Sequence, residues 1–107
     1  MTDEEIIEAA GQRLVEAVSA PARIILFGSA ARGELTRDSD VDFLVIERVV
    51  KNRVAEAVRL RDAIGHIGRP VDVIVMDEDL AARRAKVRGT MVHHALREGR
   101  VIANRAV

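Results

Sequence analysis

The stretch that decides the fold is Phe27–Glu47, FGSAARGELTRDSDVDFLVIE. It places a Gly-Ser pair at 28–29, then ten further residues, and then two aspartates, Asp40 and Asp42, at the start of an apolar run. Strand interiors normally exclude carboxylates, because removing water from an unpaired charge costs several kcal/mol or shifts its pKa. The pattern therefore indicates a functional site where a strand begins.

The residues around this stretch predict alternating helices and strands. We expect helices over about 3–19, 48–67, 77–87 and 89–99, one or two helical turns over 29–35, and strands over 22–28, 40–47, 71–76 and 100–103. Such alternation predicts an α+β (α/β) fold in two layers, with a small mixed β-sheet packed against helices. The strand order does not follow from the pattern.

The length and composition of the chain argue against several classes of function. A chain of 107 residues predicts one domain spanning 1–107. Seventeen basic and seventeen acidic residues cancel, and two aromatics offer little for base stacking, so we expect no direct nucleic-acid binding. The acidic N-terminus does not resemble a signal peptide, and no apolar run approaches the roughly 20 residues that span a bilayer. We expect a cytoplasmic protein that does not contact membranes.

Three aspartates form the first part of a candidate site. Asp40 and Asp42 are two residues apart on the expected strand, which places both carboxylates on one face, roughly 7 Å apart along the backbone. Asp72 lies in a second apolar run, and it joins them if the two strands are neighbours. Two unit charges about 4 Å apart repel by about 4 kcal/mol at an effective dielectric constant of roughly 20. A divalent cation relieves this repulsion, and oxygen ligands without cysteine favour Mg²⁺ or Mn²⁺ over zinc.

Gly28 and Ser29 form the second part of the candidate site. A strand that ends in glycine and turns into a helix presents free backbone N–H groups that suit a phosphate. A Walker loop is excluded, because Gly33 is followed by Glu34 and Leu35 instead of lysine, and the G-x-G of a dinucleotide fingerprint is absent. Taken alone, the turn fits an ordinary strand-to-helix connection with a serine N-cap. Asp40 and Asp42 alone fit a turn or a soluble strand edge, and Asp72 alone fits a salt-bridged acid. Their joint spacing favours a phosphate site ten residues before a metal-binding acid pair.

In-line nucleotidyl transfer with two metal ions needs a group that binds the triphosphate and acids that bind the metals, and this pattern offers both. The stretch GSAARGELTRDSDVD resembles the G-S-x₁₀-D-x-D signature of the DNA polymerase β-like nucleotidyltransferase superfamily, and the third acid in PVDVIV matches as well. The short chain and its ending, GTMVHHALREGRVI, resemble the minimal nucleotidyltransferases, the MNT antitoxins encoded beside HEPN-domain toxins. The resemblance covers nearly the whole chain and implies the polymerase β-like nucleotidyltransferase fold.

The resemblance also implies a role for each matching residue. Gly28 and Ser29 would hold the triphosphate of ATP. Asp40 and Asp42 would bind two Mg²⁺ ions, and Asp72 would complete one metal site and assist deprotonation of the acceptor. The residues at all five positions agree with the signature.

Arg32 matches a basic residue often seen at this place in the family and is expected to contribute to nucleotide binding. In the family ATP is the usual donor, and the acceptor is a tyrosine of the partner HEPN ribonuclease, which adenylylation silences. Larger relatives carry additional acceptor-binding domains, whereas this chain has no residues left for one. We therefore expect a toxin partner that supplies the acceptor in trans.

A binding module is the alternative interpretation. It would neutralise the toxin by complex formation without catalysis, and the apolar C-terminal helix with Met91, Val92 and Leu96 is a candidate interface. The stripe of Val50, Val54 and other residues between 48 and 67 is expected to pack on the sheet instead.

Overall fold

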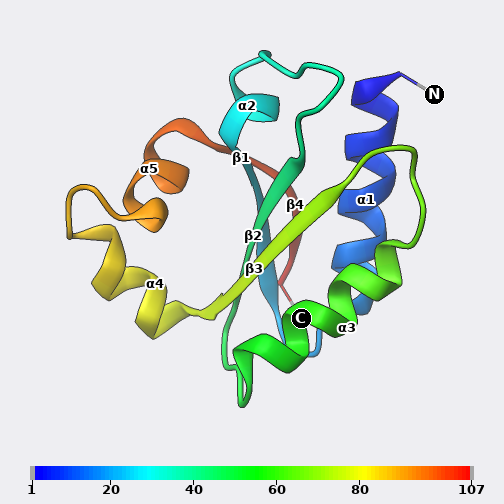
Figure 1. Ribbon diagram of the computed structural model, residues 1–107. Coiled ribbons are helices and arrows are strands. Elements are labelled where there is room, and N and C mark those ends of the chain that lie inside the picture. Colours follow the sequence, from blue (N-terminus) through cyan, green and yellow to red (C-terminus); the bar gives the residue numbers. More distant parts are fainter. Residues whose placement is uncertain (1, 107) are drawn as a thin grey trace.

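The computed structural model describes residues 2–106 and contains one four-stranded mixed sheet with five helices (Figure 1). In chain order the elements are α1 (Asp3–Ala17), β1 (Ala22–Phe27), α2 (Gly28–Ala31), β2 (Val41–Glu47), α3 (Arg53–Ile64), β3 (Val71–Asp77), α4 (Glu78–Ala85), α5 (Met91–Glu98) and β4 (Arg100–Arg105). The predicted α+β class is confirmed, and the strand at the C-terminal end is longer than expected.

The strand order is β3-β2-β1-β4. Strand β1 pairs antiparallel with both β2 and β4, whereas β2 and β3 are parallel and are connected by α3. A parallel pair needs a crossover of a dozen or more residues, which the segment containing α3 supplies. This connection aligns the first residues of β2 with the first residues of β3, with Val41 opposite Val71 and Asp42 opposite Asp72.

Helix α1 begins where the sequence predicts and ends at Ala17, two residues early. Thr2 accepts a hydrogen bond from the backbone N–H of Glu5, whose side chain accepts one from Thr2 in return, so the capping box is complete. Ile6, Ala10 and Leu14 recur at helical spacing and are buried against the sheet.

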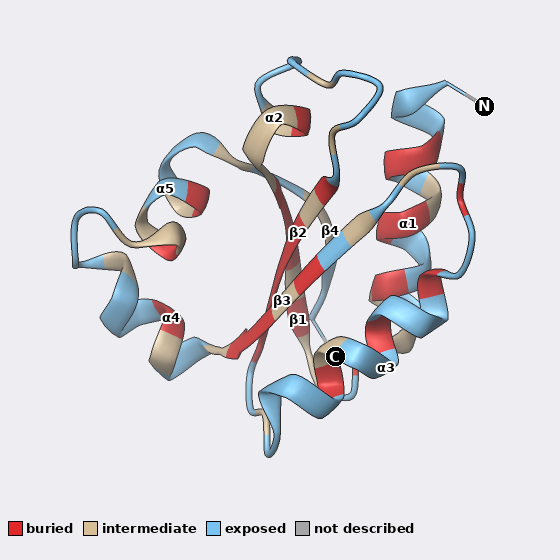
Figure 2. Cartoon of the chain, in the orientation of Figure 1, coloured by how far each residue is buried: buried red, intermediate tan, exposed pale blue. Residues whose placement is uncertain are grey.

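Helices cover both faces of the sheet. The alternation along β2 directs Phe43 and Val45 into a core with α1 and α3, and directs Leu44 and Ile46 into a second, smaller core with α4 and α5. Figure 2 shows the buried residues along the strands and on the inward sides of these helices. The short α4 and α5 thus add a partial third layer to the two expected from the sequence.

Helix α3 differs from the prediction. It begins at Arg53 instead of Arg48, because the side chain of Asn52 caps it by accepting a hydrogen bond from the N–H of Ala55. The predicted apolar stripe is wrong for Val54 and Val58, which are 75% and 51% exposed, whereas Val50, before the helix, does pack partly buried against the core. The buried side of the helix instead carries Glu56, Leu60 and Ile64.

Helix α5 corrects a second expectation. Val92 is buried, and Met91 and Leu96 are partly buried against the smaller core, so the apolar side of this helix faces the sheet and is not an open interface. Gly99 caps the helix as predicted. A side chain there would overlap with the backbone oxygens of Ala95 and Leu26, so close packing requires this glycine.

No helix within residues 2–106 is long and apolar enough to cross a bilayer.

A buried carboxyl pair connects the far end of β2 to α3. Glu47 is 1% exposed and Glu56 is 9% exposed, and both accept hydrogen bonds from the N–H of Ser19, at 2.8 and 3.3 Å. Burial, followed by the hydrogen bond with Glu56, raises the pKa of Glu47 to about 7. Burial also opposes ionisation of Glu56, but hydrogen bonds from Arg59, Glu47 and Ser19 outweigh it and lower the pKa of Glu56. The pair therefore holds one proton, on Glu47.

Because Glu47 is protonated in the folded state, we expect the free energy of unfolding to depend on pH. Because the pKa of Glu47 is raised in the folded state, the stabilisation is complete below the pKa of the unfolded chain, 4.5, and is lost as the pH rises through about 7. The free energy of unfolding should fall by on the order of 2 kcal/mol from about pH 5 to about pH 8. Urea titrations across this range measure it.

Glu47→Gln keeps the uncharged hydrogen-bonding group and should flatten this dependence. The control is Glu8→Gln, since Glu8 is exposed on α1, and it should leave the dependence unchanged. Equal pH profiles for Glu47→Gln and the wild type would show that Glu47 does not hold the proton.

Candidate functional site

The expected site gathers where β2 and β3 begin. Asp42 and Asp72 are register partners on the parallel strands, so their side chains leave the same face of the sheet about 4.8 Å apart at the backbone. Asp40 precedes β2 by one residue. Asp42 is half-buried, whereas Asp40 and Asp72 are exposed. The structure therefore joins acids from two strands that the sequence separates by 30 residues.

The charges of the acids interact. The pKa of Asp42 is raised, first by burial and then by the negative charges of Asp72 and Asp40. The positive charge of Arg32 acts in the opposite direction and lowers it. The site thus carries uncompensated negative charge around Asp42, which a cation would neutralise.

Gly28 gives the carboxylate of Asp42 its space. Phe27, the last residue of β1, is the register partner of Asp42, and the chain then turns directly into α2 at Gly28. Gly28 has φ of 71°, a conformation that favours glycine, and a Cβ built there would overlap with Oδ2 of Asp42. The phosphate-binding turn predicted from the sequence is therefore in direct contact with the acid pair. Ser29 follows within the single turn of α2 and is half-buried.

Arg32 ends α2 and already has carboxylate partners. Its Nε donates to Glu34 at 3.2 Å, and its Nη1 lies 4.0 Å from Glu98 of α5. All three side chains are about half exposed, so these pairs are weak and can exchange for another anion. The role of Glu98 was not predicted, because it lies 66 residues away in the sequence and belongs to no motif.

The acids have the donor chemistry of a Mg²⁺ site without forming a closed ligand set. Among residues 2–106, no three His, Cys, Asp or Glu side chains lie close enough together to hold a metal ion as they stand. The mutual repulsion around Asp42 nevertheless fits a hard cation. Asp40 and Asp72 are exposed and are able to turn toward an ion.

A separate cavity of about 480 Å³ lies at the opposite end of β2. It is bordered by Glu47, Val50, Asn52 and Arg59, among other residues. Glu47 lies five positions after Asp42 on β2, so the cavity lies roughly 16 Å from the acids along the strand. The cavity is therefore separate from the expected site, whose residues Asp40 and Asp72 lie exposed on the surface.

A comparison with protein families identifies the family of this chain. Residues 5–95 match the family described as the nucleotidyltransferase domain. The chain belongs to the nucleotidyltransferase domain family. The match includes all six expected site residues, from Gly28 to Asp72.

Individual relatives of this nucleotidyltransferase domain extend the comparison. A Methanocaldococcus jannaschii protein named "putative protein adenylyltransferase" is 34% identical over 80 residues, which cover 75% of this chain and 76% of that protein. A crystal structure from Sulfolobus solfataricus described as a "putative nucleotidyltransferase" has a TM-score of 0.64 at 21% identity, covering 94% of this chain and 79% of the other. A toxin–antitoxin crystal structure with AMP-PNP has a TM-score of 0.60 at 20% identity, covering 95% and 73%. These two structures share the fold.

Substituting Gly28 tests its contact with Asp42. Gly28→Ala should lower the free energy of unfolding, because alanine is strained at this φ and its Cβ displaces the carboxylate. Gly33→Ala is a matched control, since Gly33 has the same φ of 71° and nothing within 4 Å of a Cβ. Chemical denaturation should show Gly28→Ala to be less stable than Gly33→Ala by about 1–3 kcal/mol. Equal losses would mean that Gly28 is needed only for its backbone conformation.

Removing one charge tests the repulsion at the acids. Without metal, Asp42→Asn should raise the free energy of unfolding by about 1 kcal/mol and the melting temperature by roughly 4–8 °C. Added Mg²⁺ should stabilise the wild type more than this variant, because the ligand is lost. Thermal melts with and without Mg²⁺ measure both effects, with the exposed Asp62→Asn as the control. If Mg²⁺ stabilises the variant and the wild type equally, the acids do not bind the ion.

Proposed function

We propose that this domain transfers AMP from ATP to a tyrosine hydroxyl of a HEPN-domain toxin and so neutralises it. The observation that carries the proposal is the register pairing of Asp42 with Asp72 beside the Gly28 turn. It brings acids from two strands to the point where the backbone turns into α2, which is the arrangement that a nucleoside triphosphate with divalent cations requires.

Each residue has a definite part in the transfer. The backbone N–H groups at Gly28 and Ser29, with Arg32 nearby, bind the triphosphate. The acceptor oxygen forms a bond to the α-phosphorus, the bond from that phosphorus to the β-phosphate oxygen breaks, and pyrophosphate leaves. Asp72 is exposed and takes the proton of the acceptor hydroxyl.

Asp40, Asp42 and Asp72 would hold Mg²⁺, and we propose two ions. When bound, the ions neutralise the charge of the triphosphate and stabilise the departing pyrophosphate. The half-buried position of Asp42 makes it the central ligand, because its carboxylate has the least access to water.

An acceptor supplied in trans agrees with the open surface at the acids. Asp40 and Asp72 are exposed, so a side chain from another protein can approach them. The chain contains no tyrosine and therefore cannot modify itself on that residue type. We propose that one domain carries the whole catalytic apparatus and that the partner brings the acceptor.

Two relatives support the choice of donor and partner. The Methanocaldococcus jannaschii protein is named for adenylyl transfer to proteins, and its alignment covers three quarters of this chain. The toxin–antitoxin complex that shares the fold was crystallised with AMP-PNP, an analogue of ATP. By analogy with these two relatives, we propose that ATP is the donor and that a toxin is the acceptor for this chain.

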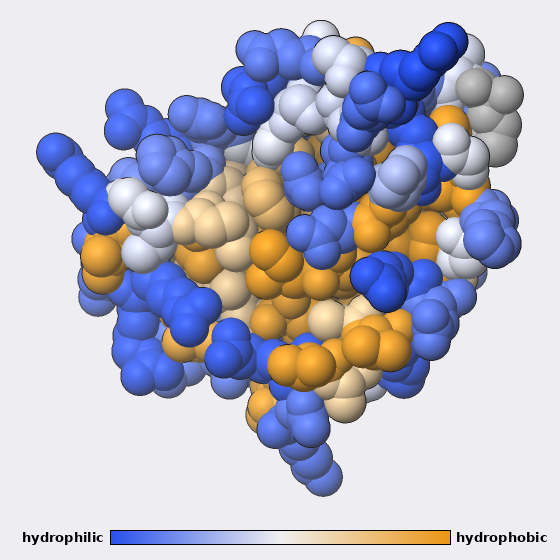
Figure 3. All heavy atoms as spheres, viewed as in Figure 1, coloured by the Kyte–Doolittle hydropathy of each residue, from blue (hydrophilic) through white to orange (hydrophobic). Residues whose placement is uncertain are grey.

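A second candidate is an antitoxin that acts by complex formation without catalysis. Apolar side chains gather in the middle of one face, between α3 and the α4–α5 pair, with hydrophilic residues around them (Figure 3). Val54 and Val58 add exposed apolar area on α3. Exposed apolar area of this kind is typical of a surface that another protein covers.

Incubation with α-labelled ATP, Mg²⁺ and the toxin encoded beside the gene tests the first candidate. The wild type should label the toxin on tyrosine, and Asp42→Asn should lose at least roughly a hundredfold in rate, because electrostatic stabilisation is removed where charge develops. Asp62→Asn serves as the control. Label transfer by Asp42→Asn at the wild-type rate would refute the mechanism.

Protection of cells from the toxin separates the two candidates. An enzyme should fail to protect when Asp40, Asp42 and Asp72 are all replaced by asparagine. Full protection by this triple variant, provided that it still binds the toxin, would establish the binding module instead.

A further inference from the structure

Arg69 is an unusually enclosed cation close to the acids. It lies in the turn between α3 and β3, three residues before Asp72, and its side chain is 15% exposed. Five other arginines whose side chains form ion pairs are at least 38% exposed, namely Arg23, Arg32, Arg59, Arg83 and Arg100. A charged side chain with so little exposure to water needs hydrogen-bond acceptors from the protein for its N–H groups.

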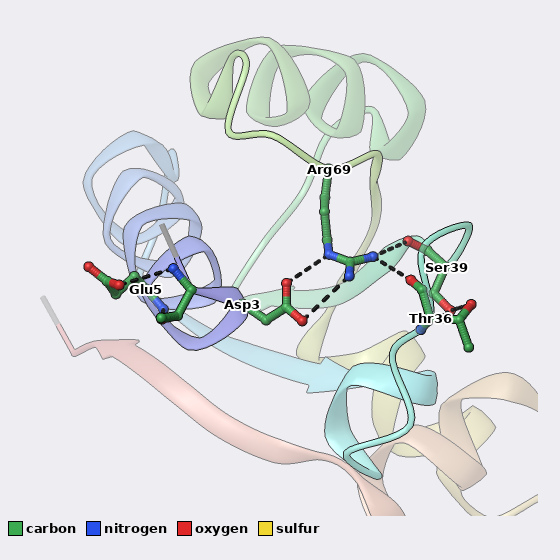
Figure 4. A network of polar contacts seen from close by, with 6 residues as sticks. Asp3, Glu5, Thr36, Ser39 and Arg69 are labelled. Carbon is green, nitrogen blue, oxygen red and sulfur yellow. Dashed lines mark hydrogen bonds and ion pairs between the residues drawn. The ribbon is translucent and has the colours of Figure 1, made fainter.

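The loop that leads to Asp40 supplies two hydrogen-bond acceptors for the guanidinium of Arg69. Its Nη1 donates to the backbone oxygens of Thr36 at 2.7 Å and Ser39 at 3.2 Å (Figure 4). Thr36 and Ser39 also bond to each other, through the N–H of Thr36 to the hydroxyl of Ser39 at 3.0 Å and through both hydroxyls at 2.9 Å. The turn is therefore compact and presents both carbonyls to Arg69.

Asp3 fixes the other side of the guanidinium. Nε of Arg69 donates to Oδ1 of Asp3 at 2.9 Å, and Nη2 donates to Oδ2 at 3.4 Å. This two-point contact sets the plane of the guanidinium, so Nη1 is held toward the loop (Figure 4). Three segments, namely the start of α1, the loop at 36–39 and the turn before β3, meet at one side chain.

The backbone continues this connection into the strands. The N–H of Val41 donates to the oxygen of Pro70 at 3.0 Å, directly beside Arg69. Asp40 lies between Ser39, which Arg69 binds, and Val41, which Pro70 binds. The segment that carries Asp72 thus holds the segment that carries Asp40 on both sides.

The charge of Arg69 is not what shifts the pKa of Asp42. Burial, Asp72, Asp40 and Arg32 shift the pKa of Asp42, and Arg69 is not among these causes. The contacts of Arg69 are with main-chain oxygens and Asp3, so its influence on the site is geometric.

We propose that Arg69 is a positioning residue that holds the turn at 36–39, and with it Asp40, in place relative to Asp72. The proposal rests on the proposed function, since it assigns Arg69 to the assembly of the metal-binding acids. Asp3 supports Arg69 by orienting its guanidinium. No substrate or ion touches either residue in this role.

Arg69→Lys separates position from charge. Lysine keeps the positive charge, but its single ammonium lacks the planar fork that reaches Asp3 and two carbonyls together. A role of charge alone survives the substitution, whereas a positioning role is lost. Arg53→Lys is the matched control, because Arg53 is exposed at the start of α3, directly after Asn52, which borders the cavity at the opposite end of β2.

The test measures Mn²⁺ binding in the presence of a non-hydrolysable ATP analogue, by electron paramagnetic resonance. Arg69→Lys should weaken Mn²⁺ binding by about tenfold, as is usual when a group that orients a ligand is changed, and Arg53→Lys should not weaken it. Asp40→Asn should weaken binding as well. The double variant should be no weaker than Asp40→Asn alone, because Arg69 acts through Asp40. Additive losses, or unchanged binding in Arg69→Lys, would overturn the proposal.

Hydrogen exchange gives a second readout that does not depend on the metal. In the metal-free protein, Arg69→Lys should accelerate exchange of the Ser39 and Val41 amides by tenfold or more, while amides in the core of β2 keep their protection. Uniform acceleration over the whole chain would indicate general destabilisation and would overturn the positioning role.

The two readouts separate this proposal from the proposed function. If the wild type binds no Mn²⁺–nucleotide, the proposed function fails, and the exchange measurement alone decides whether Arg69 holds the turn. If the wild type binds it and Arg69→Lys binds equally well, the function stands and the role of Arg69 is refuted.

Discussion

The parallel, in-register pairing of β2 with β3 is the constraint on which the site depends. It places Asp42 opposite Asp72 even though their charges repel, because the residues that follow on both strands are buried in the two cores. Burial of these apolar side chains outweighs a few kcal/mol of repulsion at one end of the sheet. The core therefore supplies the energy that keeps the acids together in the absence of a cation.

Polar contacts brace the two ends of β2 in different ways. At its start, Arg69 and Pro70 hold the loop and first residue of the strand through backbone oxygens and a backbone N–H. At its end, Glu47 and Glu56 share the N–H of Ser19 and one proton. The start of β2 carries the exposed acids of the proposed site, whereas its other end connects α3 to the sheet and is far from these acids.

Much of this architecture is encoded locally, and the order of helices and strands along the chain was predicted. The alternation in VDFLVIE fixed which residues of β2 face each core, and the capping box fixed the start of α1. The spacing from Gly28 to Asp42 indicated one site, and the chain does bring these two residues into contact. The roles of the six expected residues in catalysis remain predictions.

Features that depend on distant contacts could not be predicted. The start of α3 depends on Asn52 as a cap, which competes with an equally plausible apolar pattern upstream. Arg69 binds residues 66 and 33 positions away, and no periodicity or motif marks such a pair.

The most direct test of the proposed metal site is a crystal structure with Mn²⁺ and a non-hydrolysable ATP analogue. Anomalous density about 2.0–2.3 Å from carboxylate oxygens of both Asp42 and Asp72 is the predicted result, and an ordered nucleotide whose metal ions contact neither residue would contradict it.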